Sequence, residues 1–158
     1  MTLLYGFDFG ETTGIACGHF DVGTPYQLNQ AWEVLGGASG FLEWFRREFG
    51  RGGPLERHVA VAEKFVLNPG NQFAADLTGV PIEGALAALW RGKLYWQPPS
   101  AKAGIPDTLL HEHGLWQTGE SLDHTDGRDA NDAIIHSLEF LRRSAHLPTL
   151  KHYFPSKG

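Results

Sequence analysis

Three short apolar segments at the start of the chain, separated by tight turns, constrain the fold more than any other feature. Residues 3–9 (LLYGFDF) and 14–20 (GIACGHF) are joined by a four-residue turn, and residues 27–35 follow a Gly-Thr-Pro turn. Strands spaced this closely in sequence pair with their neighbours in an antiparallel arrangement. The first 35 residues therefore predict a three-stranded antiparallel sheet, whose first strand is buried on both faces.

The hydrophobic period changes to that of a helix after this sheet. Phe41, Leu42, Phe45 and Phe49 fall at i, i+1, i+4 and i+8, which is one face of a helix. Ser39 is placed to cap the N-terminus of this helix, and the glycine-rich segment 50–54 ends it. A helix is therefore predicted between residues 39 and 49.

Strand and helix patterns alternate along the rest of the chain. Residues 58–66 predict a strand, 67–79 a loop, and 94–97 a short fifth strand, with Pro81 as the first residue of the helix between them. A short helix is predicted over 105–113 and a long one over 126–143. Residues 1–145 are expected to form a single domain, and 146–158, which lack a core pattern, a C-terminal tail.

This order of elements is typical of one α/β fold. Three antiparallel strands followed by alternating strands and helices give the ribonuclease-H-like fold. That fold has a mixed five-stranded sheet, three antiparallel strands and then parallel ones, flanked by helices. A fold of this kind carries many functions, so the function has to be inferred from particular side chains.

Composition narrows the class of protein. A single cysteine, Cys17, excludes an internal disulfide and favours a reducing compartment. The N-terminus lacks the pattern of a signal peptide, and no uncharged stretch approaches the roughly 18 residues that a membrane span needs. We therefore expect a cytoplasmic protein that does not bind membranes.

The net charge of −5 does not by itself favour nucleic-acid binding, which depends on basic side chains near phosphates. Five of the 18 acidic residues lie between Glu120 and Asp132, with Arg128 as the one base among them. Acidic side chains gather in this way at metal sites, where two divalent cations would add positive charge. The composition is therefore neutral on DNA binding.

Two acidic residues lie inside strands that are otherwise apolar. Asp8 interrupts YGFDFG, and Glu63 interrupts AVAEKFV. A carboxylate costs free energy to bury unless it is paired or bound to a metal. The interpretations that need no metal are a turn-capping aspartate at a strand end for Asp8 and an exposed edge position for Glu63.

Asp129 and Asp132 are three residues apart, which places them on one face of the predicted C-terminal helix. Acids in a first helical turn also favour the helix dipole, so this pair alone does not require a metal. Carboxylates that converge from two strands and a helix are, however, the ligands that paired Mg²⁺ or Mn²⁺ ions need for phosphodiester hydrolysis. The acids, in this order along the chain, predict a two-metal site.

Four segments resemble the RuvC family of Holliday-junction resolvases. GFDFGETTGIA is similar to the first motif of that family, AVAEKF to the second and RDANDAIIHSLEFL to the last. The loop QPPSAKAGIP resembles one in the resolvase-like proteins of bacteriophages, which would work in the host cytoplasm. The resemblance extends over residues 3–143 and implies a homodimeric, structure-selective DNA endonuclease that resolves Holliday junctions or other branched DNA.

Carried over to this sequence, the resemblance implies that Asp8, Glu63, Asp129 and Asp132 are the catalytic acids and hold two Mg²⁺ (or Mn²⁺) ions in each active site. Asp126 is an alternative to Asp129 as the partner of Asp132. No nucleotide cofactor is implied. The loop and helix over 68–89 are the predicted dimer interface.

Further residues are expected beside these acids. Lys102 would contact the scissile phosphate, or would be a solvated loop lysine. His136, four residues after Asp132, would support the metal ligands, or would be an ordinary buried histidine. The other candidates for contact with DNA are Lys64, Arg128, Phe65 and Phe73, the two phenylalanines as stacking side chains.

Two other functions are compatible with the sequence. DFGETTG also resembles the first phosphate-binding loop of actin-like ATPases, which share the core topology but need a second such loop and an adenosine pocket. The second alternative is a junction-binding protein without catalysis, which the four intact acids disfavour. Metal-dependent nicking of branched DNA, ATP turnover and binding alone separate the three.

Overall fold

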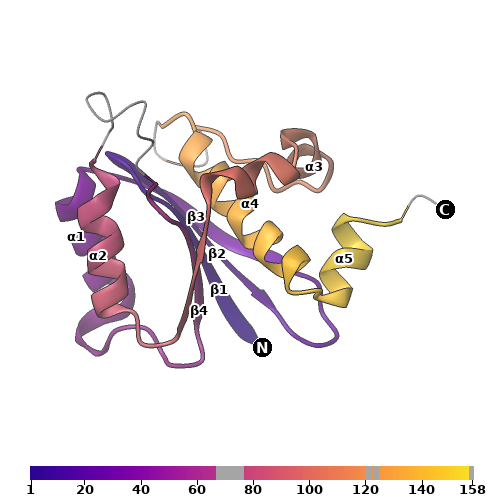
Figure 1. Cartoon of the computed structure of the whole chain (residues 1–158), viewed down its shortest axis with the longest axis horizontal. Helices are drawn as coiled ribbons and strands as arrows, with labels where there is room; N and C mark the ends of the chain where they lie inside the picture. Colours follow the sequence, from indigo (N-terminus) through magenta and orange to yellow (C-terminus); the bar gives the residue numbers. More distant parts are fainter. Residues whose placement is uncertain (67–76, 120–121, 123–124, 157–158) are drawn as a thin grey trace.

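The β-strands form one mixed sheet in the order β3-β2-β1-β4-β5 in the computed structural model, which describes residues 1–66, 77–119, 122 and 125–156 (Figure 1). The pairs β1–β2 and β2–β3 are antiparallel, while β4 is parallel to β1 and β5 is parallel to β4. This topology confirms the predicted mixed sheet. The strands are β1 (Thr2–Asp8), β2 (Thr12–Phe20), β3 (Gln27–Leu35), β4 (Val59–Glu63) and β5 (Lys93–Gln97).

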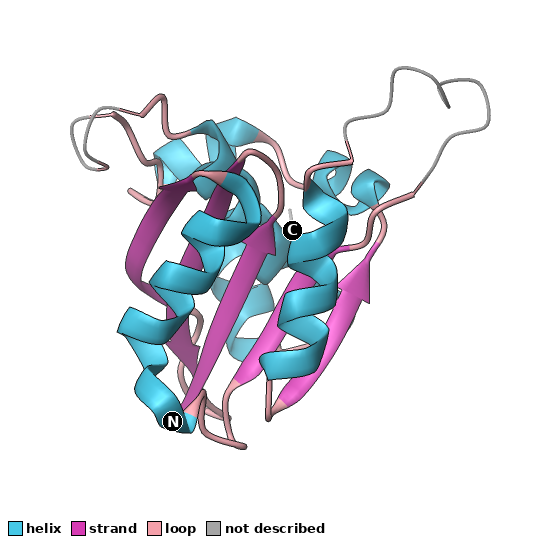
Figure 2. Ribbon diagram, turned by 90° about the vertical axis from the view of Figure 1, so that its left-hand side faces the viewer, coloured by secondary structure: helices cyan, strands magenta, loops and turns pink. Residues whose placement is uncertain are grey.

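Helices cover both faces of the sheet. α1 and α2 lie on one face, and α4 lies on the other, next to α3 and α5 (Figure 1 and Figure 2). None of the helices in the described part of the chain is long and apolar enough to cross a membrane. The helices are α1 (Gly37–Phe49), α2 (Gly79–Leu89), α3 (Asp107–Glu112), α4 (Arg128–Arg143) and α5 (Leu147–Tyr153), with 3₁₀ helices η1 (Gly50–Gly52) and η3 (Pro99–Gly104).

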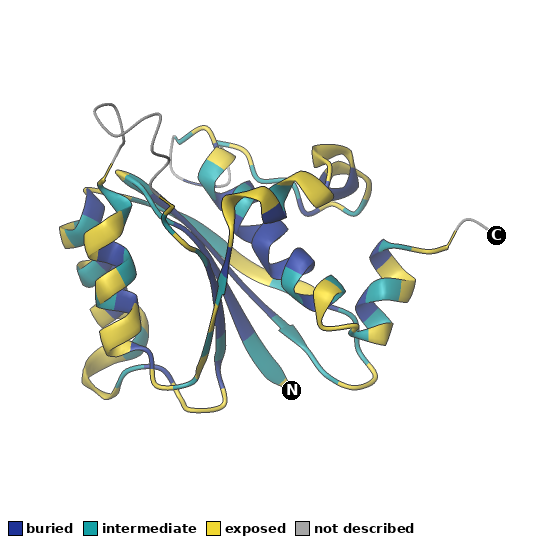
Figure 3. Cartoon of the chain, viewed as in Figure 1, coloured by how far each residue is buried: buried dark blue, intermediate teal, exposed yellow. Residues whose placement is uncertain are grey.

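Side chains of β1 alternate between two cores, one on each face of the sheet. Leu4 packs with α4 in the first core, while Tyr5 and Phe7 pack with aromatic side chains of α1 in the second. All three are buried, and buried residues follow the central strands between the two helical layers (Figure 3). Because side chains alternate along a strand, Asp8 lies on the same face as Leu4, which is the face that α4 covers.

α4 approaches the sheet closely because two glycines lie beneath it. A Cβ atom on Gly6 would overlap the carbonyl oxygen of Ala133, and a Cβ atom on Gly14 would overlap that of Asp129. Any larger residue would therefore push the helix away from β1 or β2. These two glycines set the distance between α4 and the strands on which it lies.

Two predicted helix starts are wrong. α1 begins at Gly37, after Gly36 with φ 91°, so Ser39 lies inside the helix and is not its N-cap. Glycine adopts a positive φ without steric cost, and a pattern of apolar residues does not reveal this. α2 begins at Gly79, which makes Pro81 the third residue of the helix and not the first.

The C-terminal residues also differ from the predicted tail. Leu147–Tyr153 forms α5, and its Thr149 and Tyr153 side chains are buried. The Tyr153 hydroxyl donates to the carbonyl oxygen of Tyr26 (2.7 Å), and the Tyr26 amide donates to Thr149 Oγ1 (2.9 Å). Polar contacts thus hold α5 against the connection between β2 and β3, and apolar periodicity does not detect contacts of this kind.

Replacing Gly14 with alanine should lower the free energy of unfolding by about 2 kcal/mol or more, because the added Cβ forces α4 or β2 to shift. Gly84→Ala is the matched control, since Gly84 is exposed in α2 and nothing lies within 4 Å of the added Cβ. Helix propensity should make this control more stable by roughly 0.5–1 kcal/mol. Urea denaturation measures both values, and equal stability of the two variants would show that α4 does not depend on Gly14.

Candidate metal centre

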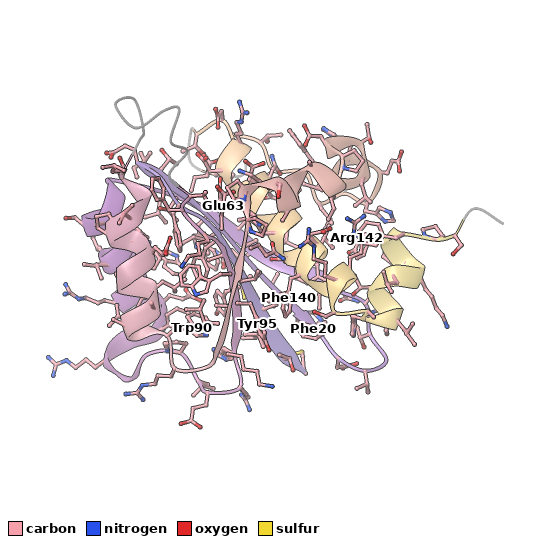
Figure 4. All side chains as sticks on the ribbon, viewed as in Figure 1. Phe20, Glu63, Trp90, Tyr95, Phe140 and Arg142 are labelled. Carbon is pink, nitrogen blue, oxygen red and sulfur yellow. The ribbon has the colours of Figure 1, made fainter. Side chains whose placement is uncertain are left out.

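Three parallel strands end at the same edge of the sheet, each with a polar residue. Asp8 is the last residue of β1, Glu63 of β4 and Gln97 of β5. Glu63 is paired with Gln97 in the register, and the residue before Asp8 is paired with the residue before Glu63. All three side chains therefore meet at one edge, on the face that α4 covers, where Figure 4 labels Glu63.

α4 crosses this edge and supplies two further side chains, Asp132 and His136, one turn apart. His136 is fully buried, with Nε2 3.1 Å from Glu63 Oε2 and Nδ1 2.8 Å from Gln97 Oε1. Both contacts are within hydrogen-bonding distance, and the tautomer of the ring decides which nitrogen donates. His136 thus connects the ends of β4 and β5 and fixes the orientation of the Glu63 carboxylate.

The ammonium group of Lys102, in η3, lies among three carboxylates. Its Nζ is 3.0 Å from Glu63 Oε2, 3.2 Å from Asp132 Oδ2 and 3.5 Å from Asp8 Oδ1. Oxygens of Asp8 and Glu63 and a ring nitrogen of His136 also lie within 4.8 Å of one another, a spacing that suits ligands of one metal ion. We call Asp8, Glu63 and Asp132 the acid centre. Its geometry already holds one cation, the lysine.

Burial and like charge shift the pKa values of this group. Burial raises the pKa of Asp8 to about 7, against the effect of Lys102 and with that of Glu63 and Asp132. Burial also acts to raise the pKa of Glu63, but hydrogen bonds from His136 and Lys102 outweigh it and bring the pKa below its usual value. Burial acts to lower the pKa of Lys102, and the carboxylates of Asp8 and Glu63 raise it above its usual range. The acid centre therefore favours the binding of a further cation. In the absence of such a cation, Asp8 retains its proton up to about neutral pH.

Asp129, predicted as the fourth metal-binding acid, lies on α4 one turn before Asp132 and belongs to a second acidic group. One of its carboxylate oxygens lies within 4.8 Å of oxygens of Glu33 and Asp126. Burial, together with these two acids, raises the pKa of Asp129 to about 6. Asp132 also raises this pKa, and Lys102 lowers it. The two acidic groups are therefore neighbours, with Asp129 and Asp126 both in the second one.

Glu33 on β3 has a role that the sequence did not reveal. Its Oε1 accepts hydrogen bonds from the backbone N–H groups of Asp129 (2.9 Å) and Ala130 (3.2 Å). The N-cap of α4 is Gly127, which has no side chain to satisfy these donors. Glu33 caps the helix from a distant strand and fixes the turn that carries Asp129. Gln97 was missed as well, although a polar residue that ends an apolar strand is the same signal that identified Asp8.

The structure places the other predicted DNA contacts at different points. Lys64 does not reach the acid centre, because its Nζ lies 3.5 Å from Glu83 Oε1 of α2 and 5.5 Å from the centre of the Trp96 ring. Arg128 is exposed at the first position of α4, next to Asp129. Phe73 lies outside the described residues.

Phe65 lies beside the acid centre. With Phe9, Glu63 and Gly79 it lines a small cavity of about 50 Å³. The Phe65 amide donates to Glu83 Oε2 (2.9 Å), which ties the segment after β4 to α2. Two aromatic side chains, Phe9 and Phe65, therefore line one cavity together with Glu63.

Comparison with known proteins shows a likeness in structure. No protein-family model matches the chain, and no curated protein matches its sequence. RuvC of Thermus thermophilus in complex with a Holliday junction substrate is similar with a TM-score of 0.57 at 15 % identity, over 92 % of this chain and 98 % of that chain. A second structure of Thermus thermophilus RuvC is similar with a TM-score of 0.55 at 16 % identity, over 91 % of this chain and 97 % of that chain. The fold is ribonuclease-H-like, as in RuvC. Neither structure supports the predicted likeness to bacteriophage proteins in particular.

Asp8→Asn should raise the melting temperature of the metal-free protein, and more at pH 8 than at pH 5. The pKa of Asp8 in the folded protein, about 7, lies above the ordinary aspartate value of about 4, so the folded state binds this proton more tightly than the unfolded chain does. The resulting stabilisation is full at low pH and is lost as the pH rises through this window. Thermal denaturation in chelator at both pH values measures the difference. A lower melting temperature of the variant at pH 8 would show that the contact with Lys102 outweighs the cost of burial.

Proposed function

We propose that this protein is a metal-dependent endonuclease that cuts branched DNA such as Holliday junctions. One observation carries the proposal, the convergence of the Asp8, Glu63 and Asp132 carboxylates around a single cationic group. The likeness in fold to RuvC, which was solved with a Holliday junction substrate, supports the substrate class.

The side chains present fit divalent metal ions. Mg²⁺ and Mn²⁺ prefer carboxylate oxygens, and the lysine ammonium is a stand-in cation at the point where those oxygens converge. Asp8, Glu63 and Asp132 would hold the first ion, and Asp129, or Asp126 in its place, would contribute to the second. Bound in pairs, such ions activate a water and stabilise the leaving oxygen in phosphodiester hydrolysis.

Residues around the acid centre would orient its parts and the DNA. His136 holds the Glu63 carboxylate in place from within the core. Arg128, exposed beside Asp129, would contact a DNA phosphate, and Phe65, which lines a cavity with Glu63, would contact a base next to the cut. Lys64 is paired with Glu83 and is left out of this set.

A homodimer belongs to this proposal, because a four-way junction needs two paired incisions. The interface predicted over 68–89 lies partly outside the described residues. Within it, α2 exposes the apolar side chains of Val80 (43 %) and Leu89 (40 %), which suits an interface. We propose α2 as part of the contact between two copies of the chain.

Asp8→Asn should reduce metal-dependent nicking of a labelled four-way junction by at least about 100-fold, while junction binding persists. Asparagine removes a ligand charge with little change in volume, and Glu63→Gln and Asp132→Asn should act alike. Glu56→Gln, an exposed acid before the start of β4, is the matched control and should cut normally. Near wild-type cutting by Asp8→Asn sinks the metal-site assignment, and binding without cutting by the wild type would support the non-catalytic alternative.

Calcium should support junction binding but not cleavage. Ca²⁺ accepts the same oxygen ligands at longer distances and in looser geometry than Mg²⁺ does. Gel-shift and nicking assays in Ca²⁺, Mg²⁺, Mn²⁺ and chelator, on linear and branched DNA, measure binding and cutting separately. Equal cleavage in Mg²⁺ and in chelator would exclude metal-dependent chemistry, and ATP turnover under these conditions would favour the actin-like alternative.

A further inference from the structure

We propose that Lys102 is an internal counter-ion, which occupies the metal position in the metal-free protein and leaves it for a DNA phosphate when a divalent ion binds. The exchange itself concerns metal binding alone. Only the phosphate as the second partner of Lys102 rests on the proposed function.

The distances make the lysine and a metal ion mutually exclusive. Lys102 Nζ lies between 3.0 and 3.5 Å from one oxygen each of Asp8, Glu63 and Asp132. Mg²⁺ draws its oxygen ligands to about 2.0–2.1 Å, which contracts the same three carboxylates around one point. No room remains there for an ammonium group, and two cations so close would repel each other. Metal binding to these oxygens therefore requires Nζ to leave.

The backbone that carries Lys102 is fixed, so the exchange needs only its side chain. Ala101 and Ile105 on either side are buried at 1 % and 3 % exposure. The carbonyl oxygen of Gly104 accepts a hydrogen bond from Arg142 Nη1 (3.2 Å), and Arg142 Nε lies 2.7 Å from Glu139 Oε2 on α4. Figure 4 labels Arg142 on this helix.

The lysine side chain can move out to solvent, but its contacts with the acidic side chains hold it in the centre until a metal ion binds. It is 28 % exposed and has four methylene groups, so bond rotation alone can carry the ammonium group towards solvent. In the metal-free state it offsets the repulsion between the Glu63 and Asp132 carboxylates, and that with Asp8 once Asp8 is ionised. A metal ion must therefore displace it, and the affinity for metal is reduced by this competition.

Displacement also couples metal binding to DNA binding. Once out of the centre, Lys102 has lost its three carboxylate contacts, and a phosphodiester group next to the centre offers a new one. The metal ion displaces the lysine and the DNA phosphate binds it, so each ligand raises the protein's affinity for the other by the same factor. The wild-type protein should accordingly bind metal more tightly when DNA is present, and Lys102→Met should lose most of this coupling.

The first experiment measures Mn²⁺ affinity without DNA, from the electron paramagnetic resonance signal of free Mn²⁺. Lys102→Met keeps most of the side-chain volume but removes the charge, and it should bind Mn²⁺ at least 10-fold more tightly than the wild type. Lys93→Met, exposed at the opposite end of β5, is the matched control and should match the wild type. Equal or weaker binding by Lys102→Met, or no binding by either protein, overturns the proposal.

The second experiment uses the wild-type protein, so it does not depend on the folding of a variant. An amine-acylating reagent, with the products mapped by mass spectrometry, should modify Lys102 at least 5-fold faster after Mg²⁺ or Ca²⁺ is added, with Lys93 unchanged. Adding a four-way junction with Ca²⁺ should protect Lys102 again. A Lys102 rate that does not respond to metal overturns the exchange. Exposure by metal without protection by the junction would leave the exchange in place and count against the proposed function.

Discussion

The close contact between α4 and the sheet is the constraint on which the rest of the structure depends. Gly6 and Gly14 leave the space in which the helix lies across β1 and β2. On its buried face α4 adds Ile134 and Leu138 to the core, and the same helix carries Asp132 to the ends of β1 and β4. Packing in the core and placement of the acids are thus one property of one helix, because a densely packed interior transmits any shift of its parts.

The acid centre is stabilised poorly as a purely structural feature. One ammonium group is set against three carboxylates, and Asp8 is buried deeply enough for its pKa to rise to about 7. An asparagine at that position would satisfy the same space without the charge. A protein that retains such a cluster, with His136 buried behind it and hydrogen-bonded to Glu63, sacrifices stability at one point of the fold, which is typical of functional sites.

The sequence predicted the sheet and the long helix because both depend on local apolar periodicity, and it indicated Asp8 and Glu63 because each breaks such a pattern. What it missed depends on contacts between distant segments. Glu33 caps a helix 96 residues away, and Thr149 binds the backbone of Tyr26 at a separation of 123 residues. Neither contact leaves a periodic trace in the sequence. For Lys102, the family resemblance predicted only a contact with the scissile phosphate. Nothing in its own segment of the sequence indicates that it contacts three carboxylates from three other elements.

Under the proposed function, the acidity of the chain bears directly on how DNA would reach this centre. With Asp8 ionised, three carboxylates and one ammonium give the acid centre and its lysine a net formal charge of −2, and the neighbouring Glu33, Asp126 and Asp129 add further negative charge. This negative charge repels phosphate groups, because proteins usually bind DNA through basic side chains that replace the counter-ions around its phosphates. Two divalent ions would offset four of these negative charges and free the lysine at the same time. In a protein of net charge −5, metal binding would then govern the approach of the phosphodiester as well as its hydrolysis, and a large basic surface would not be required for either.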